Sequence, residues 1–425
     1  MFNNYAMYDD EIIESAQQVA SGELVLSQED LEFLLNRTVD LSNSQKLEDE
    51  LVFGVFRKLL SVSDMDDDDE AERVFDAAKR IQNSDIDDPL KAFDILAENG
   101  VNFTEKRFYS GDMTTLRDWL LEWSFSVGLV ERLLRLGVDM NEPVIKGKTP
   151  AYIVANRDFK PKGRWDNTDM EEEFAKAVSY FDMESMEALT AEGTSAAHRA
   201  VKNNHYQMLE VMIKAGINVN LAEDQPKIVG STLLHTACEY GSVECVKLLI
   251  EAGADDTLLD AKEETPAHRA LFHDYITGSK KLDTETRTEL LRALKNVDSV
   301  GKYGMTPMTM ALNCRDYAIS RDLVPVFIEK GADVNHADNL GYTPLMLGSG
   351  METLKALVKA GADVNARNRD GNTPLHFALD RNSSQEAAYL IKKGADFNVA
   401  NNDGVTPMQI AAEKGLDELF PFMGL

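Results

Sequence analysis

Two cysteines lie close enough together in the sequence to raise the question of a metal site. Cys238 and Cys245 are separated by seven positions. A structural zinc site takes four cysteine or histidine ligands at characteristic spacings, and two of these are missing around this pair. Neither cysteine has the Cys/His pattern that would activate a thiol. We therefore interpret both as small buried core residues, with zinc binding as the alternative.

The most acidic stretch of the chain, Ser61 to Glu70, has the composition of a calcium-binding loop. An EF-hand loop needs glycine at its sixth position and glutamate at its twelfth. Counted from Asp64 or from Asp66, other residues stand at both positions. The run precedes a predicted helix over 71–81, and acidic residues stabilise the start of a helix. We interpret the run as a solvated loop that starts this helix. Weak cation binding, or steering of a basic partner, is the alternative.

The motifs of common enzyme classes are absent from the sequence. It contains no Gly-x-Gly-x-x-Gly, no phosphate-binding Walker loop, no Gly-x-Ser-x-Gly nucleophile elbow and no His-Glu-x-x-His zinc motif. We therefore predict a protein that is not an enzyme, with no catalytic residue, no metal and no cofactor. The alternative is an enzyme with a cryptic site in residues 1–110 or in an inserted loop.

Four of the 7 histidines occupy the same place in a recurring block of residues. The clearest copy, Thr-Pro-Leu-His-Phe-Ala, begins at Thr373. Related blocks begin, at intervals of 46, 37, 33, 41, 37, 30 and 33 residues, at Thr149, Ser195, Thr232, Thr265, Thr306, Thr343, Thr373 and Thr406. The histidines at the fourth position are His198, His235, His268 and His376. A second motif, such as Gly-Ala-Asp-Val-Asn at 331–335, follows in most copies.

Each copy predicts two short helices and an extended return. Thr373 can cap the first helix with its hydroxyl, and Pro374 suits the first helical position. A second helix is predicted over 385–393, and Gly394 ends it because glycine adopts the left-handed conformation at little cost. The asparagine- and aspartate-rich segment 401–404 predicts a turn. One such helix pair cannot bury its apolar face alone, so the copies must stack.

These blocks closely resemble the ankyrin repeat, which has a period of about 33 residues and a Thr-Pro-Leu-His-x-Ala core. The resemblance implies an all-α fold, an α-solenoid of stacked helix-turn-helix repeats with β-turn fingers, with about nine or ten repeats in one stack. It also implies structural roles for Thr373, Pro374, Gly394 and the four motif histidines. In this family the imidazole hydrogen-bonds to the backbone between neighbouring repeats.

The strength of the resemblance divides the chain into three parts. Residues 193–425 should be well-formed repeats that end in a truncated capping repeat. Residues 66–192 should be degenerate repeats, with the segment from Thr115 in place of the motif. Residues 1–65 read as helices, and they form either degenerate repeats or a helical N-terminal cap.

Two insertions and one deletion interrupt the period. The insertions follow the first helix of their repeats and include residues 157–165 and 274–281, which are locally basic and carry aromatic residues such as Trp165. A partner-contact loop is one reading, and neutral variation of loop length is the other. The repeat that begins at Thr343 is short, and its first helix should be cut down around 348–350.

The ankyrin resemblance implies a protein–protein interaction scaffold or adaptor. Its partner should bind on the concave face formed by the fingers and the first helices, where a rigid stack lowers the entropic cost of binding. A solvated surface position is the alternative for every candidate, and a structural spacer is the alternative for the protein. The candidates are Asn339, Leu340, Tyr342, Arg369, Asp370, Asn372, Asn402, Asp403 and Val405 in the fingers, Met308, Phe377 and Asp380 on the first helices, and Trp165 in the first insertion.

The charge of the chain is strongly negative and unevenly distributed. The formal net charge is −29, and residues 1–100, with 25 acidic and 8 basic residues, carry −17 of it. This argues against binding to nucleic acid or to an anionic membrane, because both attract clustered lysine and arginine. A basic protein partner stays open, and so does an acidic inhibitor or antitoxin-like protein that shields a basic target.

The compartment is predicted from what the sequence lacks. The start of the chain has no basic region followed by an apolar core, and no apolar run approaches the roughly 18 residues of a membrane span. Its 3 cysteines are too few for disulfide bonds to stabilise a chain of this length. We therefore expect a cytoplasmic protein, with export by a route without a signal left open, and the oligomeric state is not predicted.

Overall fold

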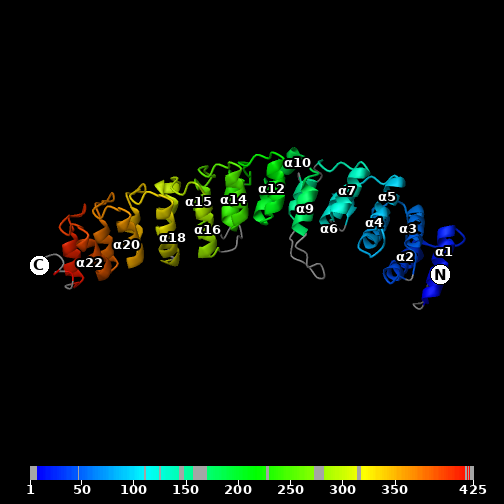
Figure 1. Cartoon of the computed structure of the whole chain (residues 1–425), viewed down its shortest axis with the longest axis horizontal. Coiled ribbons are helices and arrows are strands. Elements are labelled where there is room, and N and C mark those ends of the chain that lie inside the picture. The colour runs from blue at the N-terminus through cyan, green and yellow to red at the C-terminus, as the bar shows by residue number, and fades with distance from the viewer. Residues whose placement is uncertain are drawn as a thin grey trace. The chain divides into compact units, whose positions relative to one another are not determined.

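The structure is a computed structural model (Figure 1), and its contacts group the chain into two compact units. Unit 1 comprises Met1–Ala200 and Gln207–Ile217, and unit 2 comprises Val201–Tyr206 and Asn218–Leu425. Each unit is described by itself. The structure describes residues 7–45, 47–109, 112–123, 126–142, 148–156, 170–225, 229–271, 282–313 and 317–416, together with Leu419 and Pro421.

Unit 1 begins with four long helices of 13 to 16 residues, which share a buried apolar core. Leu31 and Leu34 of the second helix and Phe56 and Leu59 of the third are buried, as their helical spacing in the sequence predicts. The helices of this unit are α1 (Asp9–Ser21), α2 (Gln28–Asn43), α3 (Asp49–Val62), α4 (Asp68–Gln82), α5 (Lys91–Glu98), α6 (Leu116–Trp123), α7 (Val127–Arg135), α8 (Pro150–Ala155), α9 (Met170–Val178), α10 (Met183–Glu187), α11 (Ala196–Lys202, which ends in unit 2) and α12 (Tyr206–Lys214).

The acidic residues of the N-terminal part gather at the starts of these helices. The carboxylate of Asp67 caps α4 by accepting a hydrogen bond from the backbone N–H of Glu70 at 3.0 Å. Carboxylates at a helix start interact favourably with the positive end of the helix dipole. Much of the acidic surplus therefore stabilises local structure. The acidic residues in the first turns of α1 to α4 are Asp9, Asp10, Glu11, Glu29, Asp30, Asp49, Glu50, Asp68, Asp69 and Glu70.

One element departs from the all-helical expectation. A two-stranded antiparallel sheet pairs β1 (Lys106–Tyr109) with β2 (Asp112–Thr115), in a register that sets Lys106 opposite Thr115. The sheet leads directly into α6, where the Thr115 hydroxyl accepts a hydrogen bond from the backbone N–H of Asp118 at 3.1 Å. Apart from this sheet, the described elements are helical.

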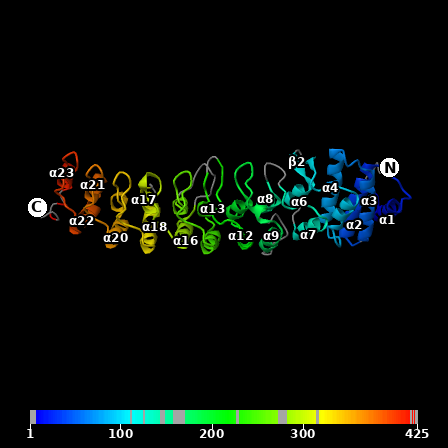
Figure 2. The ribbon, with the colours of Figure 1, turned by 90° about the horizontal axis from the view of Figure 1, so that it is seen from above.

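Unit 2 is a stack of helix pairs. Each first helix begins directly after the threonine of its block, and five of them, α15, α17, α19, α21 and α23, carry proline at the first helical position. Figure 2 shows the loops between helix pairs projecting on the same side of the helices. The helices are α13 (Leu233–Tyr240), α14 (Val243–Glu251), α15 (Pro266–Arg269), α16 (Thr284–Ala293), α17 (Pro307–Asn313), α18 (Tyr317–Glu329), α19 (Pro344–Leu347), α20 (Met351–Lys359), α21 (Pro374–Asp380), α22 (Ser384–Lys392) and α23 (Pro407–Glu413), with a 3₁₀ turn η1 at Lys302–Gly304.

The short repeat has the shortened first helix that its length predicts. Helix α19 has only 4 residues, and its end is held by the following repeat. The Arg381 guanidinium donates to the carbonyl oxygens of Met346 and Gly348 at 3.1 and 3.0 Å. The Glu386 carboxylate accepts from the backbone N–H of Gly350 at 2.6 Å. These side chains replace the backbone hydrogen bonds of the missing helical turn.

Candidate functional site

The motif histidines of unit 2 link each first helix to the finger that follows it. His376 Nδ1 accepts a hydrogen bond from the Thr373 backbone N–H at 3.1 Å and lies 2.9 Å from the Thr373 hydroxyl. Its Nε2 lies 3.2 Å from the carbonyl oxygen of Val405. His235 and His268 repeat this arrangement towards the carbonyl oxygens of Glu264 and Met305, at 2.9 and 3.1 Å.

This geometry assigns the histidine protons. Since Nδ1 accepts from the backbone, the proton of the neutral ring lies on Nε2 and is donated to the next finger. Burial lowers the pKa of both His235 and His268 to about 4, and it also lowers the pKa of His376. The rings are therefore neutral at physiological pH: Nδ1 holds the start of the ring's own helix, and Nε2 links that repeat to the next.

Five fingers of unit 2 have tips of the same construction. We call these the finger tips, and in each the backbone N–H of the first residue donates to the carbonyl oxygen of the fifth at 2.8–3.0 Å. In four of the five, an aspartate or asparagine at the first position also accepts two backbone N–H groups at 2.8–3.1 Å. The finger tips are residues 260–264, 301–305, 338–342, 368–372 and 401–405.

Backbone hydrogen bonds join each finger tip to the next. The backbone N–H of Asn339 donates to Tyr303 O, that of Arg369 to Leu340 O, and that of Asn402 to Asp370 O, at 2.9–3.0 Å. Such a contact requires close approach. A Cβ atom at Gly341, whose φ is +83°, would lie 2.9 Å from the Cα atom of Asn368. Glycine is therefore required at this position by its backbone conformation and by the neighbouring finger.

Asparagine side chains make a second set of bridges at the bases of the fingers. Asn335 accepts from the backbone N–H of Asp363 at 2.7 Å and donates to Gly361 O at 3.1 Å. Asn365 makes the equivalent pair to Asp396 and Gly394, at 2.8 and 3.0 Å. The final Asn of the Gly-Ala-Asp-Val-Asn motif thus bonds to the same motif in the next repeat.

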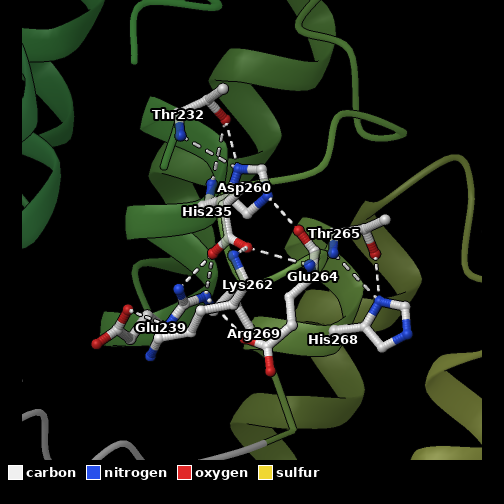
Figure 3. A network of polar contacts seen from close by, with 9 residues as sticks. All are labelled: Thr232, His235, Glu239, Asp260, Lys262, Glu264, Thr265, His268 and Arg269. Atoms are coloured by element: carbon white, nitrogen blue, oxygen red, sulfur yellow. Dashed lines mark hydrogen bonds and ion pairs between the residues drawn. The ribbon is translucent and has the colours of Figure 1, made fainter. Parts of the chain in front are cut away.

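A buried ionic cluster lies between the first helices α13 and α15 (Figure 3). The guanidinium of Arg269, 4% exposed, is surrounded by three carboxylates: it donates to Asp260 at 2.9 Å and lies 3.2 Å from Glu264 and 3.4 Å from Glu239. Burial opposes the positive charge, but the three carboxylates outweigh it and raise the pKa of Arg269. The sequence prediction missed this cluster, because its members come from three separate segments.

Beyond this cluster, the finger tips and first helices of unit 2 carry several apolar side chains that are exposed or partly exposed. Tyr303 and Leu340, the third residues of adjacent finger tips, are 64% and 57% exposed. Tyr342 contacts Phe377 of the next repeat, with ring centroids 5.4 Å apart. We call the following set the apolar band, and all its members are at least partly exposed: Tyr303, Met305, Met310, Leu340, Tyr342, Leu347 and Phe377.

The structure places most of the predicted partner-binding residues on this side of unit 2. Tyr342, Asn372, Val405 and Phe377 are partly exposed, and the exposed candidates are Asn339, Leu340, Arg369, Asp370, Asn402, Asp403 and Asp380. The prediction for Met308 is wrong, because Met308 is fully buried. In the repeat alignment it corresponds to the core residue Leu375, whereas Met310 corresponds to Phe377. Trp165 and the insertions 157–165 and 274–281 lie outside the described residues.

Other candidates for chemistry are accounted for by packing. Cys238 and Cys245 are buried free thiols, and burial raises the pKa of Cys238. Among the residues that the structure describes, no group of three or more His, Cys, Asp or Glu side chains is arranged to hold a metal ion. No helix in the described ranges is long and apolar enough to cross a membrane.

Unit 1 has a polar groove of about 440 Å³ between α2 and α4. Glu32 and Asp76 line it, and partial burial raises the pKa of both carboxyls. Arg73 lies 3.9 Å from Glu32, so charges of both signs meet in the groove. This mixed lining does not favour one class of ligand.

Comparison with known proteins agrees with this geometry. Residues 198–282, 279–368 and 348–423 match a family model described as ankyrin repeats (3 copies), which together cover more than half of the chain. Transient receptor potential cation channel subfamily A member 1 of Drosophila melanogaster is 26% identical over 189 residues, 43% of this chain and 15% of the relative. Human neurogenic locus notch homolog protein 1 is 30% identical over 135 residues, 32% of this chain and 5% of the relative.

Among solved structures, the ankyrin repeat domain of Bcl-3 is 24% identical, with a TM-score of 0.43, over 54% of this chain and 99% of that chain. The matches to the two relatives cover 15% or less of those proteins, so the likeness is confined to their repeats. Ankyrin repeats are protein–protein interaction modules. The helix pairs and the linked fingers agree with the family match. The chain belongs to the ankyrin repeat family, because the family model matches more than half of it.

Proposed function

We propose that the protein is a non-enzymatic scaffold or adaptor that binds a protein partner on the finger face of unit 2, the surface formed by the finger tips and the first helices. The observation that carries this proposal is the apolar band. Contiguous exposed apolar surface marks interaction sites, and tyrosine and phenylalanine are enriched in them. Tyr342 and Phe377 are the central aromatic anchors of this face, together with the exposed Leu340.

The construction of the fingers supports the same proposal. Hydrogen bonds from finger to finger, and from each histidine to the next finger, hold the backbone beneath the band. A surface that is already ordered loses little conformational entropy on binding. The exposed polar candidates Asn339, Arg369, Asp370, Asn372 and Asp403 surround the band, as polar residues do at the rim of an interface.

The test is affinity capture of the full-length protein from its native cells, followed by mass spectrometry. Phe377→Ala combined with Leu340→Ser should abolish capture of the specific partner. Tyr389→Ala is the matched control, because Tyr389 is a partly exposed aromatic residue on the second helix α22. Equal capture by both variants would refute the finger face as the binding surface.

A second candidate function is an acidic inhibitor or antitoxin-like protein that shields a basic target with its N-terminal part. The net charge of −17 in residues 1–100 supports it. Charge steering is screened beyond about 8 Å at physiological ionic strength, so association with the partner would slow steeply as salt rises. An association rate that is independent of salt would rule this version out.

The organisation of the remaining chain is part of the proposal. We assign residues 1–65 to an N-terminal helical cap, 66–192 to degenerate repeats and 193–425 to well-formed repeats. The long helices α1 to α4 support a cap. Deletion of 1–65 should lower the midpoint of thermal unfolding, because it exposes apolar residues that a terminal repeat must hide. We also propose a cytoplasmic location, which cell fractionation tests, and partner contacts by the two insertions, which their separate deletion tests.

A further inference from the structure

The fifth residue of each first-helix block defines one row across unit 2. In successive repeats this row reads Thr236, Arg269, Met310, Leu347, Phe377 and Ile410, of which the first and last are buried. A second row, at the fifth position of each finger tip, reads Glu264, Met305, Tyr342, Asn372 and Val405. Both rows change from charged to apolar at the same boundary between repeats, so one end of the apolar band adjoins the ionic cluster.

The spacing of the repeats limits the conformation of a segment that lies along these rows. Packed helices are roughly 8–10 Å apart, so equivalent side chains in adjacent repeats recur at about that distance. A polyproline II helix has three residues per turn and rises about 3.1 Å per residue, which brings every third side chain to the same side about 9 Å further on. A β-strand returns to the same side after about 7 Å, and one α-helical turn advances about 5.4 Å. The polyproline II repeat therefore matches the repeats of this protein best.

The charge at the Arg269 end favours a cation. Glu239, Asp260 and Glu264 face Arg269, and the adjacent Lys262 and Glu263 leave the net charge of this group at −2. The side chain of Glu264 is 21% exposed, the largest exposed fraction among the three carboxylates around Arg269. The opposite end is not negative, because Asp370 and Asp380 stand in the same segment as Arg367, Arg369 and Arg381, and these five residues carry a net charge of +1.

From these rows we infer the class of partner: a polyproline II segment with a lysine or arginine followed by apolar residues at every third position. The apolar side chains contact Met310, Leu347 and Phe377, and the cation lies against Glu264. The inference rests on the proposed function and adds the conformation, spacing and charge of the bound segment. The two rows fix the order of these contacts along unit 2, and either chain direction satisfies them.

Synthetic peptides test the inference with the full-length protein. The probe is fluorescein-labelled Gly-Lys-Pro-Ser-Leu-Pro-Ser-Leu-Pro-Ser-Leu-Pro-Gly, together with its reversed sequence, and binding is followed by fluorescence anisotropy. At least one of the two should bind. A peptide of the same composition with leucine at every second position should bind about tenfold more weakly, and replacement of lysine by glutamate should weaken binding about fivefold.

Protein variants locate the binding site. Phe377→Ala should weaken binding of the probe about tenfold, whereas Tyr389→Ala should leave it unchanged. Glu264→Gln should remove the preference for lysine over glutamate in the peptide. Circular dichroism melts of each variant confirm that the fold is intact.

Three results would overturn the inference: no binding by either chain direction, equal binding of the peptide with leucine at every second position, or a lysine preference that survives Glu264→Gln. These outcomes are separate from failure of the proposed function. If the peptides fail while capture of the cellular partner still depends on Phe377 and Leu340, the finger face binds a partner of another conformation. If capture is also independent of these residues, the proposed function fails as well.

Discussion

Tyr342 and Phe377 lie in consecutive repeats with their ring centroids 5.4 Å apart and their planes inclined at 45°. Tyr342 ends one finger tip, and Phe377 stands on the first helix of the next repeat, so the contact crosses the repeat interface. Tilted aromatic pairs contribute roughly 0.5–1.5 kcal/mol beyond the area they bury. A double-mutant cycle of Tyr342→Ala and Phe377→Ala in urea unfolding should give a coupling energy in this range. Additive effects would show that the contact is not stabilising.

Thr373→Ala should lower the free energy of unfolding by about 1 kcal/mol, because the hydroxyl that holds the start of α21 and the ring of His376 is lost. Thr373→Ser retains the hydroxyl and should behave like the original protein within about 0.5 kcal/mol. Urea unfolding of the two variants provides the comparison. If both substitutions had the same effect, the methyl group of the threonine rather than its hydroxyl would matter.

The buried histidines predict a loss of stability in mild acid. Their folded pKa of about 4 lies below the unfolded value of about 6.5, so the unfolded chain binds more protons between these values. The stability contributed by each neutral ring is present above pH 6.5. It is lost as the pH falls towards 4, by about 1.4 kcal/mol per pH unit.

His235→Gln isolates this effect from the carboxylates. Gln409 occupies the same position of its block and accepts from the Thr406 backbone N–H at 2.8 Å, so glutamine fits the site. The variant should show a smaller decrease in the urea midpoint between pH 7 and pH 5 than the original protein. Parallel pH curves would mean that His235 does not titrate in this range.

Arg269→Met should destabilise the protein by roughly 3–5 kcal/mol, because it leaves three carboxylates without their buried cation. Arg269→Lys keeps the charge but loses the planar fork of donors, and an intermediate loss is expected. Thermal unfolding at neutral pH measures both. The prediction fails if the methionine variant is as stable as the original, since the cluster would then contribute nothing net.

Gly341 and Gly404 form a matched pair for testing the contact between fingers. Both have positive φ, +83° and +78°, so alanine costs roughly 1–2 kcal/mol of backbone strain at either site. At Gly341 the new Cβ atom would also press against the backbone of Asn368, whereas at Gly404 no atom lies within 4 Å. Gly341→Ala should therefore be the more destabilising in urea unfolding. Equal effects would show that the fingers separate without cost.

The periodic features of this fold could be predicted from the sequence, because they repeat. Helix α21 begins at Pro374, directly after the threonine of its block, and the short α19 follows from the short interval after Thr343. The prediction for Met308 is wrong because Thr-Pro-Met-Thr-Met contains two methionines, and only the second, Met310, is partly exposed. When the whole blocks are aligned, Met310 stands at the position equivalent to Phe377.

The features that break the repeat were harder to predict. The Arg269 cluster joins α13, a finger and α15, and no single stretch of sequence contains it. A signal was nevertheless present, since Arg269 occupies a position where three later repeats carry Met, Leu and Phe. The β1–β2 sheet is only 4 residues long in each strand, too short for a reliable alternation of apolar and polar residues.

Because the fingers are tied to one another through main-chain atoms, this attachment does not depend on which side chain stands at the third position of each tip. In order along the chain these residues are Lys262, Tyr303, Leu340, Asp370 and Asp403. These residues differ in charge, size and polarity, and the same main-chain hydrogen bonds accommodate all of them. A substitution at a tip therefore changes the chemistry that this face presents and leaves the main-chain links beneath it in place.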